Sequence, residues 1–179
     1  MRLFVALRLP AEVAAHADRS VAPVRAAHPE LRWVPADRWH LTLAFYGDIE
    51  DERVGGVVEM VGREVAERGP LELRLAGSGI FERRALWLGV EGGSAGDGGG
   101  DMDALRALAR AVTFDRSRFR AHVTVARLRG GVDPEPARAA LAGYSGPSWV
   151  AGSVHLVRSR LGAAPAYDDV ASWPLRPRS

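Results

Sequence analysis

Two tetrapeptides in the chain share one pattern, in which a histidine and a threonine are separated by a single apolar residue. They are His40-Leu41-Thr42-Leu43 and His122-Val123-Thr124-Val125. Histidine titrates near neutral pH, so one imidazole can accept a proton while another donates one. Threonine hydroxyls can donate hydrogen bonds to oxygens on which negative charge grows. Such a set suits acid–base cleavage of a phosphate ester, in which water is deprotonated and a sugar oxygen is protonated as it leaves.

Strand geometry explains the spacing within each motif. Side chains alternate faces along a strand, so His40 and Thr42 share one face, while the apolar residues Leu41, Leu43 and Phe45 share the other. The second motif alternates in the same way. The two histidines lie 82 positions apart (122 minus 40) in a chain of 179 residues. This separation predicts one motif in each of two lobes, with a polar groove between them.

A metal site is the competing interpretation of the two histidines. Catalytic zinc usually takes three protein ligands, and beside the first motif Asp48, near the end of its strand, is the acid considered as a third ligand. No HExxH signature is present. The sequence therefore predicts no metal. The remaining histidines have no threonine or serine two residues on, and we expect structural roles for them; they are His16, His28 and His155.

Composition narrows the classes of function. The chain has no cysteine, which excludes disulfides, thiolate metal sites and cysteine nucleophiles. All 24 basic residues are arginines, whose rigid fork of donors suits phosphate oxygens, although the net charge is only +2. The first apolar run is too short for a signal peptide, and no run approaches the ~18 residues of a membrane span. We expect a cytoplasmic protein that is a monomer and has no membrane partner.

The hydrophobic periodicity predicts helices alternating with strands. Helices are expected over 11–28, 51–68, 101–112 and 133–142. Strands are expected over 2–9, 31–34, 39–46, 71–75, 85–90, 121–128, 153–161 and 167–173. Pro23 should kink or shorten the first helix, and Gly92–Gly100 should form a flexible loop. This order predicts the α+β class, with helices covering mostly antiparallel sheets.

At this point the motifs resemble those of the two-histidine (2H) phosphoesterase superfamily. Within it, the chain is similar to the RNA 2′,3′-cyclic phosphodiesterase family, historically called 2′-5′ RNA ligases. The resemblance covers essentially the whole chain and rests on four further segments: Arg2–Ala6, Trp33–Pro35, Arg118–Arg127 and Leu156–Leu161. The chain departs from the family at Ala121, where a proline usually precedes the second histidine.

The resemblance implies a single bilobal domain over 1–179, with two pseudo-symmetric lobes, helices on the outer faces and a central groove. It implies hydrolysis of a terminal 2′,3′-cyclic phosphate on RNA ends to a 2′-phosphate, without metal or cofactor. By analogy, His40 would donate the proton to the leaving oxygen and His122 would be the base. Thr42 and Thr124 are expected to bind the phosphate.

Arg127 is a further candidate for substrate binding, because the family commonly has arginine at this place. Strand alternation, however, puts Arg127 with Val123 and Val125, away from the histidine face. It could reach the groove only if the strand bends or ends by this point.

The sequence leaves other functions open. The substrate could be a small cyclic nucleotide, or the groove could belong to a binding module for RNA ends that has no turnover. The reverse reaction, 2′-5′ ligation of RNA, is a third alternative. Mass action in water favours hydrolysis over ligation.

Overall fold

The structure is a computed structural model that describes residues 1–81, 84–93, 98–115, 118–128, 130–160 and 166–177. Its elements follow one another in an alternating order of strands and helices. They are β1 (Arg2–Arg8), α1 (Ala11–Ala27), β2 (Arg32–Trp33), η1 (Ala36–Arg38), β3 (His40–Asp48), η2 (Asp51–Arg53), α2 (Val54–Ala66), β4 (Leu71–Phe81), β5 (Ala85–Gly92), α3 (Gly98–Val112), β6 (His122–Arg127), α4 (Glu135–Leu141), β7 (Ser145–Ala151), β8 (Ser153–Arg160) and β9 (Ala166–Pro174).

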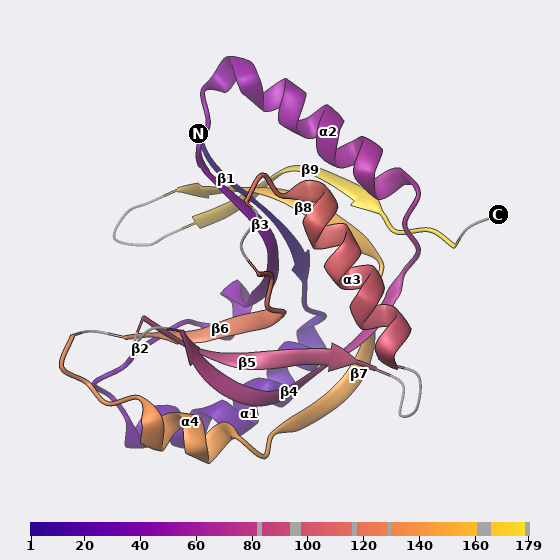
Figure 1. The fold of residues 1–179 in the computed structure, drawn as a ribbon. Coiled ribbons are helices and arrows are strands. Elements are labelled where there is room, and N and C mark those ends of the chain that lie inside the picture. The colour runs from indigo at the N-terminus through magenta and orange to yellow at the C-terminus, as the bar shows by residue number, and fades with distance from the viewer. Residues whose placement is uncertain (82–83, 94–97, 116–117, 129, 161–165, 178–179) are drawn as a thin grey trace.

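The strands form one sheet in the order β7-β4-β5-β6-β3-β1-β8-β9, and the short β2 pairs with β6. Every pairing between the described strands is antiparallel. The sheet curls strongly, with α1 and α4 against the half that contains β4 and β7 and α2 against the half that contains β8 and β9 (Figure 1). The predicted α+β class with mostly antiparallel sheet is therefore confirmed.

The two halves of the sheet meet between β3 and β6, the strands that carry the two motifs. The only Cα pair in register between these described strands joins Leu41 to Val123. Both side chains are fully buried. The second residue of each motif therefore joins the two halves through its backbone, and its side chain packs in the core.

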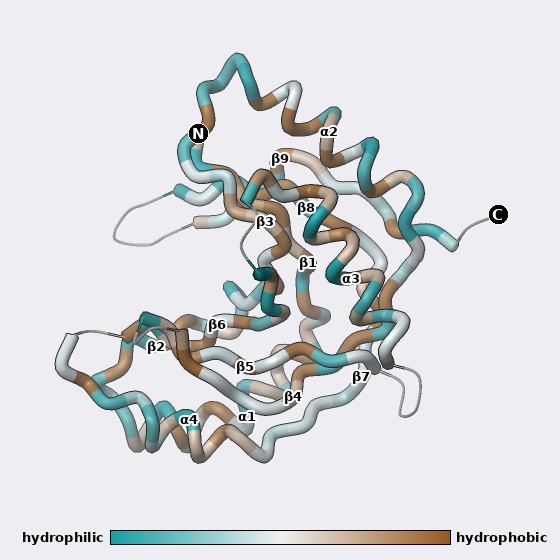
Figure 2. The backbone as a smooth tube through the Cα atoms, in the orientation of Figure 1, coloured by the Kyte–Doolittle hydropathy of each residue, from teal (hydrophilic) through white to brown (hydrophobic). Residues whose placement is uncertain are grey.

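The core follows the apolar pattern of the sequence. Hydrophobic residues, coloured brown, lie along β1 and β3, while in the helices they alternate with hydrophilic residues, coloured teal (Figure 2). In α2 the buried residues Val57, Val61 and Val65 recur every fourth position and form one face. None of the helices in the described ranges is long and apolar enough to cross a membrane.

The expectation of a flexible loop over Gly92–Gly100 is wrong at both ends. Gly92 ends β5, and Gly98 begins α3, while residues 94–97 lie outside the described part of the chain. Glycine costs a helix about 1 kcal/mol relative to alanine. The buried Leu105 and Leu108 further along α3 supply the packing that offsets this cost.

Two strand predictions also need correction. β4 continues past Leu75 to Phe81, with an irregularity in its register at Gly77, whose φ is +65°. The whole of β7 was missed, because Ser145, Gly146 and Pro147 are turn-forming residues. β7 is an edge strand of the sheet. A proline such as Pro147 is tolerated there, because an N–H on the open side of an edge strand has no neighbouring strand to bond. Pro23 does not shorten the first helix, which continues to Ala27.

Shortening a buried side chain where the two halves of the sheet meet should destabilise the protein. Leu41→Ala removes a fully buried side chain and should lower the free energy of unfolding by about 2–5 kcal/mol. Val150→Ala is the matched control, because Val150 is 62% exposed and should change stability by less than about 0.5 kcal/mol. Urea unfolding followed by circular dichroism measures both. Equal stability of the two variants would contradict a packed junction at Leu41.

Candidate active site

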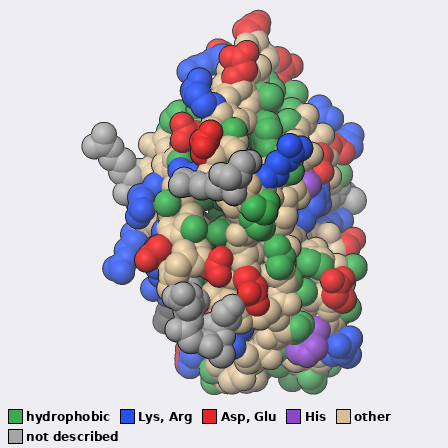
Figure 3. All heavy atoms as spheres, turned by 90° about the vertical axis from the view of Figure 1, so that its right-hand side faces the viewer, with side chains coloured by type: hydrophobic (Ala, Val, Ile, Leu, Met, Phe, Trp, Pro, Cys, Tyr) green, Lys and Arg blue, Asp and Glu red, His purple; other side chains and the backbone are tan. Residues whose placement is uncertain are grey.

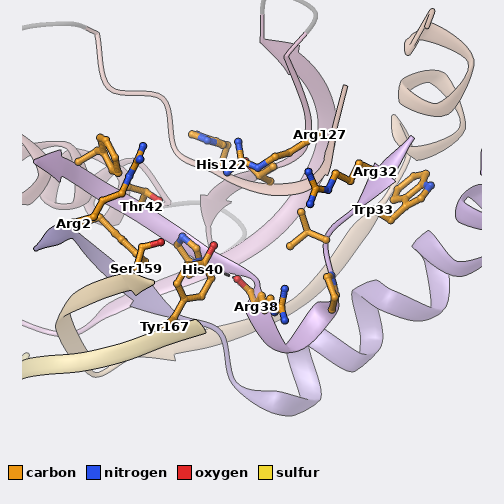
Figure 4. Close-up of a pocket in the computed structure, with 15 residues that line it drawn as sticks. Arg2, Arg32, Trp33, Arg38, His40, Thr42, His122, Arg127, Ser159 and Tyr167 are labelled. Atoms are coloured by element: carbon orange, nitrogen blue, oxygen red, sulfur yellow. Dashed lines mark hydrogen bonds between the residues drawn. The ribbon is translucent and has the colours of Figure 1, made fainter. Parts of the chain in front are cut away.

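A groove of about 460 Å³ lies on the concave side of the sheet, where β3 and β6 meet. Both histidines and both threonines line it, and so does Arg127. His40 and Thr42 come from β3, while His122 and Arg127 come from β6 (Figure 4). The structure therefore brings together all five residues that the sequence put forward.

The register relates the two motifs by a pseudo-two-fold axis. Because Leu41 pairs with Val123 in an antiparallel manner, His40 lies opposite Thr124 and Thr42 lies opposite His122. The axis passes between the two paired apolar residues. Each histidine thus has one threonine beside it on its own strand and another across the junction.

The two imidazoles are held by the same hydrogen bond. His40 Nδ1 lies 2.8 Å from the carbonyl oxygen of Arg38, and His122 Nδ1 lies 2.7 Å from that of Arg120. A carbonyl only accepts, so Nδ1 carries the proton in both rings. Each Nε2 is therefore the nitrogen left to bind or exchange a proton with a ligand.

Aromatic rings hold both imidazoles in place. His40 stacks on Phe4, with ring centroids 4.8 Å apart, and meets the edge of Tyr167 at 5.3 Å. His122 makes an edge contact with Phe81 at 4.6 Å and a tilted contact with Trp87 at 6.1 Å. Gly79 leaves room for Trp87, because a Cβ there would lie 2.1 Å from the indole ring. These contacts reduce the freedom of both rings to leave the groove.

Burial lowers the pKa of both histidines below the ordinary value of 6.5. For His40 the positive charges of Arg8, His122 and Arg127 lower the pKa further, against the opposing hydrogen bond to the Arg38 carbonyl. For His122 the charge of Arg120 adds to burial. Without a bound anion, this shift favours the neutral form of both imidazoles.

The groove is strongly basic. Among the described residues that line it are four arginines and no aspartate or glutamate; the arginines are Arg2, Arg32, Arg38 and Arg127. β2 places Arg32 directly opposite Arg127 on β6, and like charges in such positions repel one another. On the face over α2, by contrast, acidic and basic side chains are interspersed (Figure 3). The charge in the groove favours an anionic ligand.

A bulge in each motif strand explains where simple alternation fails. Trp87 and Leu86 are adjacent in β5 but pair with Thr124 and Ala126, so Val125 is an extra residue in β6. The extra residue reverses the alternation that follows it and turns Arg127 to the side of Thr124. The bulge is thus the bend that Arg127 needs in order to reach the groove, which simple alternation does not provide.

The first motif has the same bulge at its fourth residue. Ala6 pairs with Thr42 and Val5 with Ala44, which leaves Leu43 unpaired. Phe45 consequently turns into the groove and is 53% exposed, although alternation placed it with the core residues. The hydroxyl of the next residue, Tyr46, donates a hydrogen bond to the Val112 carbonyl at the end of α3.

Several lining residues escaped the sequence analysis. Ser159 reaches the groove from β8, which lies beside β1, and Tyr167 reaches it from β9, which lies beside β8. Arg38 did carry a signal. Both motifs read Arg-x-His-x-Thr, because Arg38 precedes His40 by two residues just as Arg120 precedes His122.

The other histidines lie outside this groove. His155 Nε2 lies 2.8 Å from the Ser153 hydroxyl, and its Nδ1 lies 3.1 Å from Asp169. His16 and His28 also have side-chain partners, a tyrosine and a glutamate. Within the described ranges, no three histidine, aspartate or glutamate side chains are grouped so that they could hold a metal ion.

Comparisons with known proteins agree with this geometry. The family model described as LigT like phosphoesterase matches residues 7–87. The protein TT0787 of Thermus thermophilus superposes with a TM-score of 0.75 at 26% identity, over the full length of both chains. The crystal structure of Escherichia coli LigT complexed with phosphate gives a TM-score of 0.67 at 26% identity, over 98% of each chain.

Over residues 7–87 the chain is similar to the LigT-like phosphoesterases, and its fold resembles that of LigT over nearly the whole chain. A further relative is the RNA 2′,3′-cyclic phosphodiesterase of Geobacillus stearothermophilus, which is 29% identical over 96% of this chain. That match spans 56% of the length of the Geobacillus protein, and the match to the E. coli K12 RNA 2′,3′-cyclic phosphodiesterase spans 49% of its length. The resemblance of the two motifs thus extends to the fold that carries them.

The pKa directions give a test that requires no substrate. In ¹H–¹⁵N NMR titrations, the His40 and His122 imidazoles should both titrate below pH 6.5, because burial disfavours the charged ring. Inorganic phosphate should raise both pKa values, because an anion in the groove favours the charged form. Chloride at the same ionic strength is the control. Titration of either ring above 6.5 without phosphate would contradict the burial described here.

Proposed function

We propose that this protein is a LigT-like phosphoesterase that hydrolyses the 2′,3′-cyclic phosphate at the 3′ end of RNA and leaves a 2′-phosphate. One observation carries the proposal: two imidazoles, each held through Nδ1, present Nε2 to the same arginine-lined groove. Related proteins named RNA 2′,3′-cyclic phosphodiesterase support the choice of substrate.

In the proposed reaction, His122 Nε2 takes a proton from water as the water oxygen attacks phosphorus. The bond between phosphorus and the ribose 3′ oxygen breaks, and protonated His40 donates its Nε2 proton to that oxygen. The products are a 2′-phosphate and a free 3′ hydroxyl. Both proton transfers come from histidine, so this step uses no metal.

The charge of the substrate helps to prepare this pair. Both histidines have a lowered pKa in the free protein, which favours a neutral base but leaves the acid unprotonated at pH 7. A bound phosphodiester anion raises the pKa of the nearer imidazole and favours its protonation. The bound substrate thereby favours protonation of the histidine that acts as the acid.

The remaining lining residues would bind the phosphate. Thr42 and Thr124 lie beside the histidines and can donate to the non-bridging oxygens. Arg127 and Arg32 lie side by side, and an anion between them would relieve their repulsion. These contacts would strengthen as charge on the phosphoryl oxygens grows in the transition state.

Removal of either histidine should abolish turnover. With an oligoribonucleotide ending in a 2′,3′-cyclic phosphate, His40→Ala and His122→Ala should each lower kcat by about 10²–10⁴-fold. The wild type should be equally active with and without EDTA. His28→Ala, outside the groove, is the control. Activity that needs added metal, or that survives loss of either histidine, would contradict the mechanism.

A modified leaving group separates the two histidine roles. Sulfur in place of the 3′ bridging oxygen leaves as a thiolate, which needs no proton from an acid. On this substrate His40→Ala should regain activity to within about tenfold of the wild type, whereas His122→Ala should stay inactive. Product release measured with a thiol reagent follows the reaction. Rescue of His122→Ala instead would reverse the assignment.

A further inference from the structure

The groove does not end at the histidines. A second hollow of about 1020 Å³ continues from it toward the C-terminal end of α3 and the residues that follow this helix. Thr42, Phe45 and His122 line both hollows. A phosphate bound beside Thr42 and His122 therefore lies where the two hollows meet, and a chain attached to it can enter the second hollow directly.

Exposed aromatic rings distinguish this second hollow. Among the described residues, four large hydrophobic side chains are exposed, and two of them are aromatic. These two are Phe45, at 53%, and Phe114, at 73%, and both line the hollow. Water contact with an apolar ring is unfavourable, so two such rings on one wall indicate a surface that a flat ligand covers.

Phe114 is held by its neighbours despite its exposure. Its ring packs against that of Tyr46, with centroids 5.4 Å apart and planes tilted by 42°. Tyr46 is fixed in turn, because its hydroxyl donates to the Val112 carbonyl at the last residue of α3. The guanidinium of Arg2 lies over the Phe45 ring, 5.1 Å from its centroid. Each ring thus packs against a neighbouring side chain.

The lining of this hollow is basic as well. Among the described residues that line it are Arg106, Arg110, Arg118 and Arg120, and one carboxylate, that of Asp115. Arg106 pairs with Asp103, which lies outside the hollow, and Arg120 lies over the Trp87 ring. Arg110 and Arg118 are exposed and make no ion pair with any residue that the structure describes. Cations and exposed aromatic rings in one hollow suit a single-stranded nucleic acid, in which phosphates alternate with flat bases.

We propose that the second hollow binds the nucleotide on the 5′ side of the terminal one, with its base on Phe114 and its phosphate beside Arg110 and Arg118. The terminal cyclic phosphate remains at the histidines, so this assignment rests on the proposed function. It deepens that function by making the substrate an oligonucleotide rather than a mononucleotide.

The test measures binding, independently of turnover. The ligands are a 5′-fluorescein tetraribonucleotide ending in a 2′-phosphate, followed by anisotropy, and a nucleoside 2′-monophosphate that competes with it. Phe114→Ala should weaken binding of the tetranucleotide about tenfold, because stacking of one base contributes about 1–3 kcal/mol. Its affinity for the mononucleotide should stay within about twofold of the wild type, since the histidine groove is unchanged. Val150→Ala is the matched control, as an exposed apolar residue outside both hollows.

Salt dependence tests the two arginines. Each lost phosphate contact should reduce the slope of log affinity against log salt by about 0.7 for the tetranucleotide. Arg110→Gln and Arg118→Gln should each show this reduction, and Arg63→Gln, on an exposed part of α2, should not.

Two results would overturn the assignment: an equal loss of affinity for tetranucleotide and mononucleotide in Phe114→Ala, or no loss for either. Hydrolysis by the wild type is measured separately. A protein that binds the tetranucleotide through Phe114 but opens no cyclic phosphate would refute the proposed function and leave the second subsite standing.

Discussion

The backbone pairing of Leu41 with Val123 determines how the rest of the molecule is arranged. It joins the two halves of the sheet at the centre of both motifs, and it sets each histidine opposite the threonine of the other motif. A shift of either strand by one residue would turn its histidine toward the core and its apolar residues toward the groove. The burial of Leu41 and Val123 opposes such a shift. The same contact therefore stabilises the fold and keeps the two histidines in the groove.

Equal motifs need not have equal chemistry. Both imidazoles are held by the carbonyl of the residue two positions before them, yet their neighbours differ. His40 lies between Phe4 and Tyr167 and senses the charges of Arg8 and Arg127, while His122 has Phe81 at its edge and Arg120 nearby. The symmetric backbone thus presents the Nε2 atoms of both histidines in the same way, and their different neighbours allow one to act as acid and the other as base.

Strand alternation was sufficient to place His40, Thr42 and their counterparts in β6, because each pair lies before any irregularity in its strand. It failed at Phe45 and Arg127, which follow the bulges. The bulged residues, Leu43 and Val125, are ordinary apolar residues, and no glycine marks them. The arginine from β2 could not be found either, because Arg32 reaches the groove only through pairing with a distant strand.

The open curl of the sheet leaves β7 and β9 as its outermost strands, and each is a place where another chain could add a strand. Pro147 in β7 has no N–H to donate to such a strand, and Pro174 ends β9 in the same way. Asp168 and Asp169 add acidic charge along β9, where they hold arginines of β8 and β1. The open sheet that leaves a groove for a ligand also has two exposed edges, and the prolines and charged residues on these edge strands disfavour edge-to-edge aggregation.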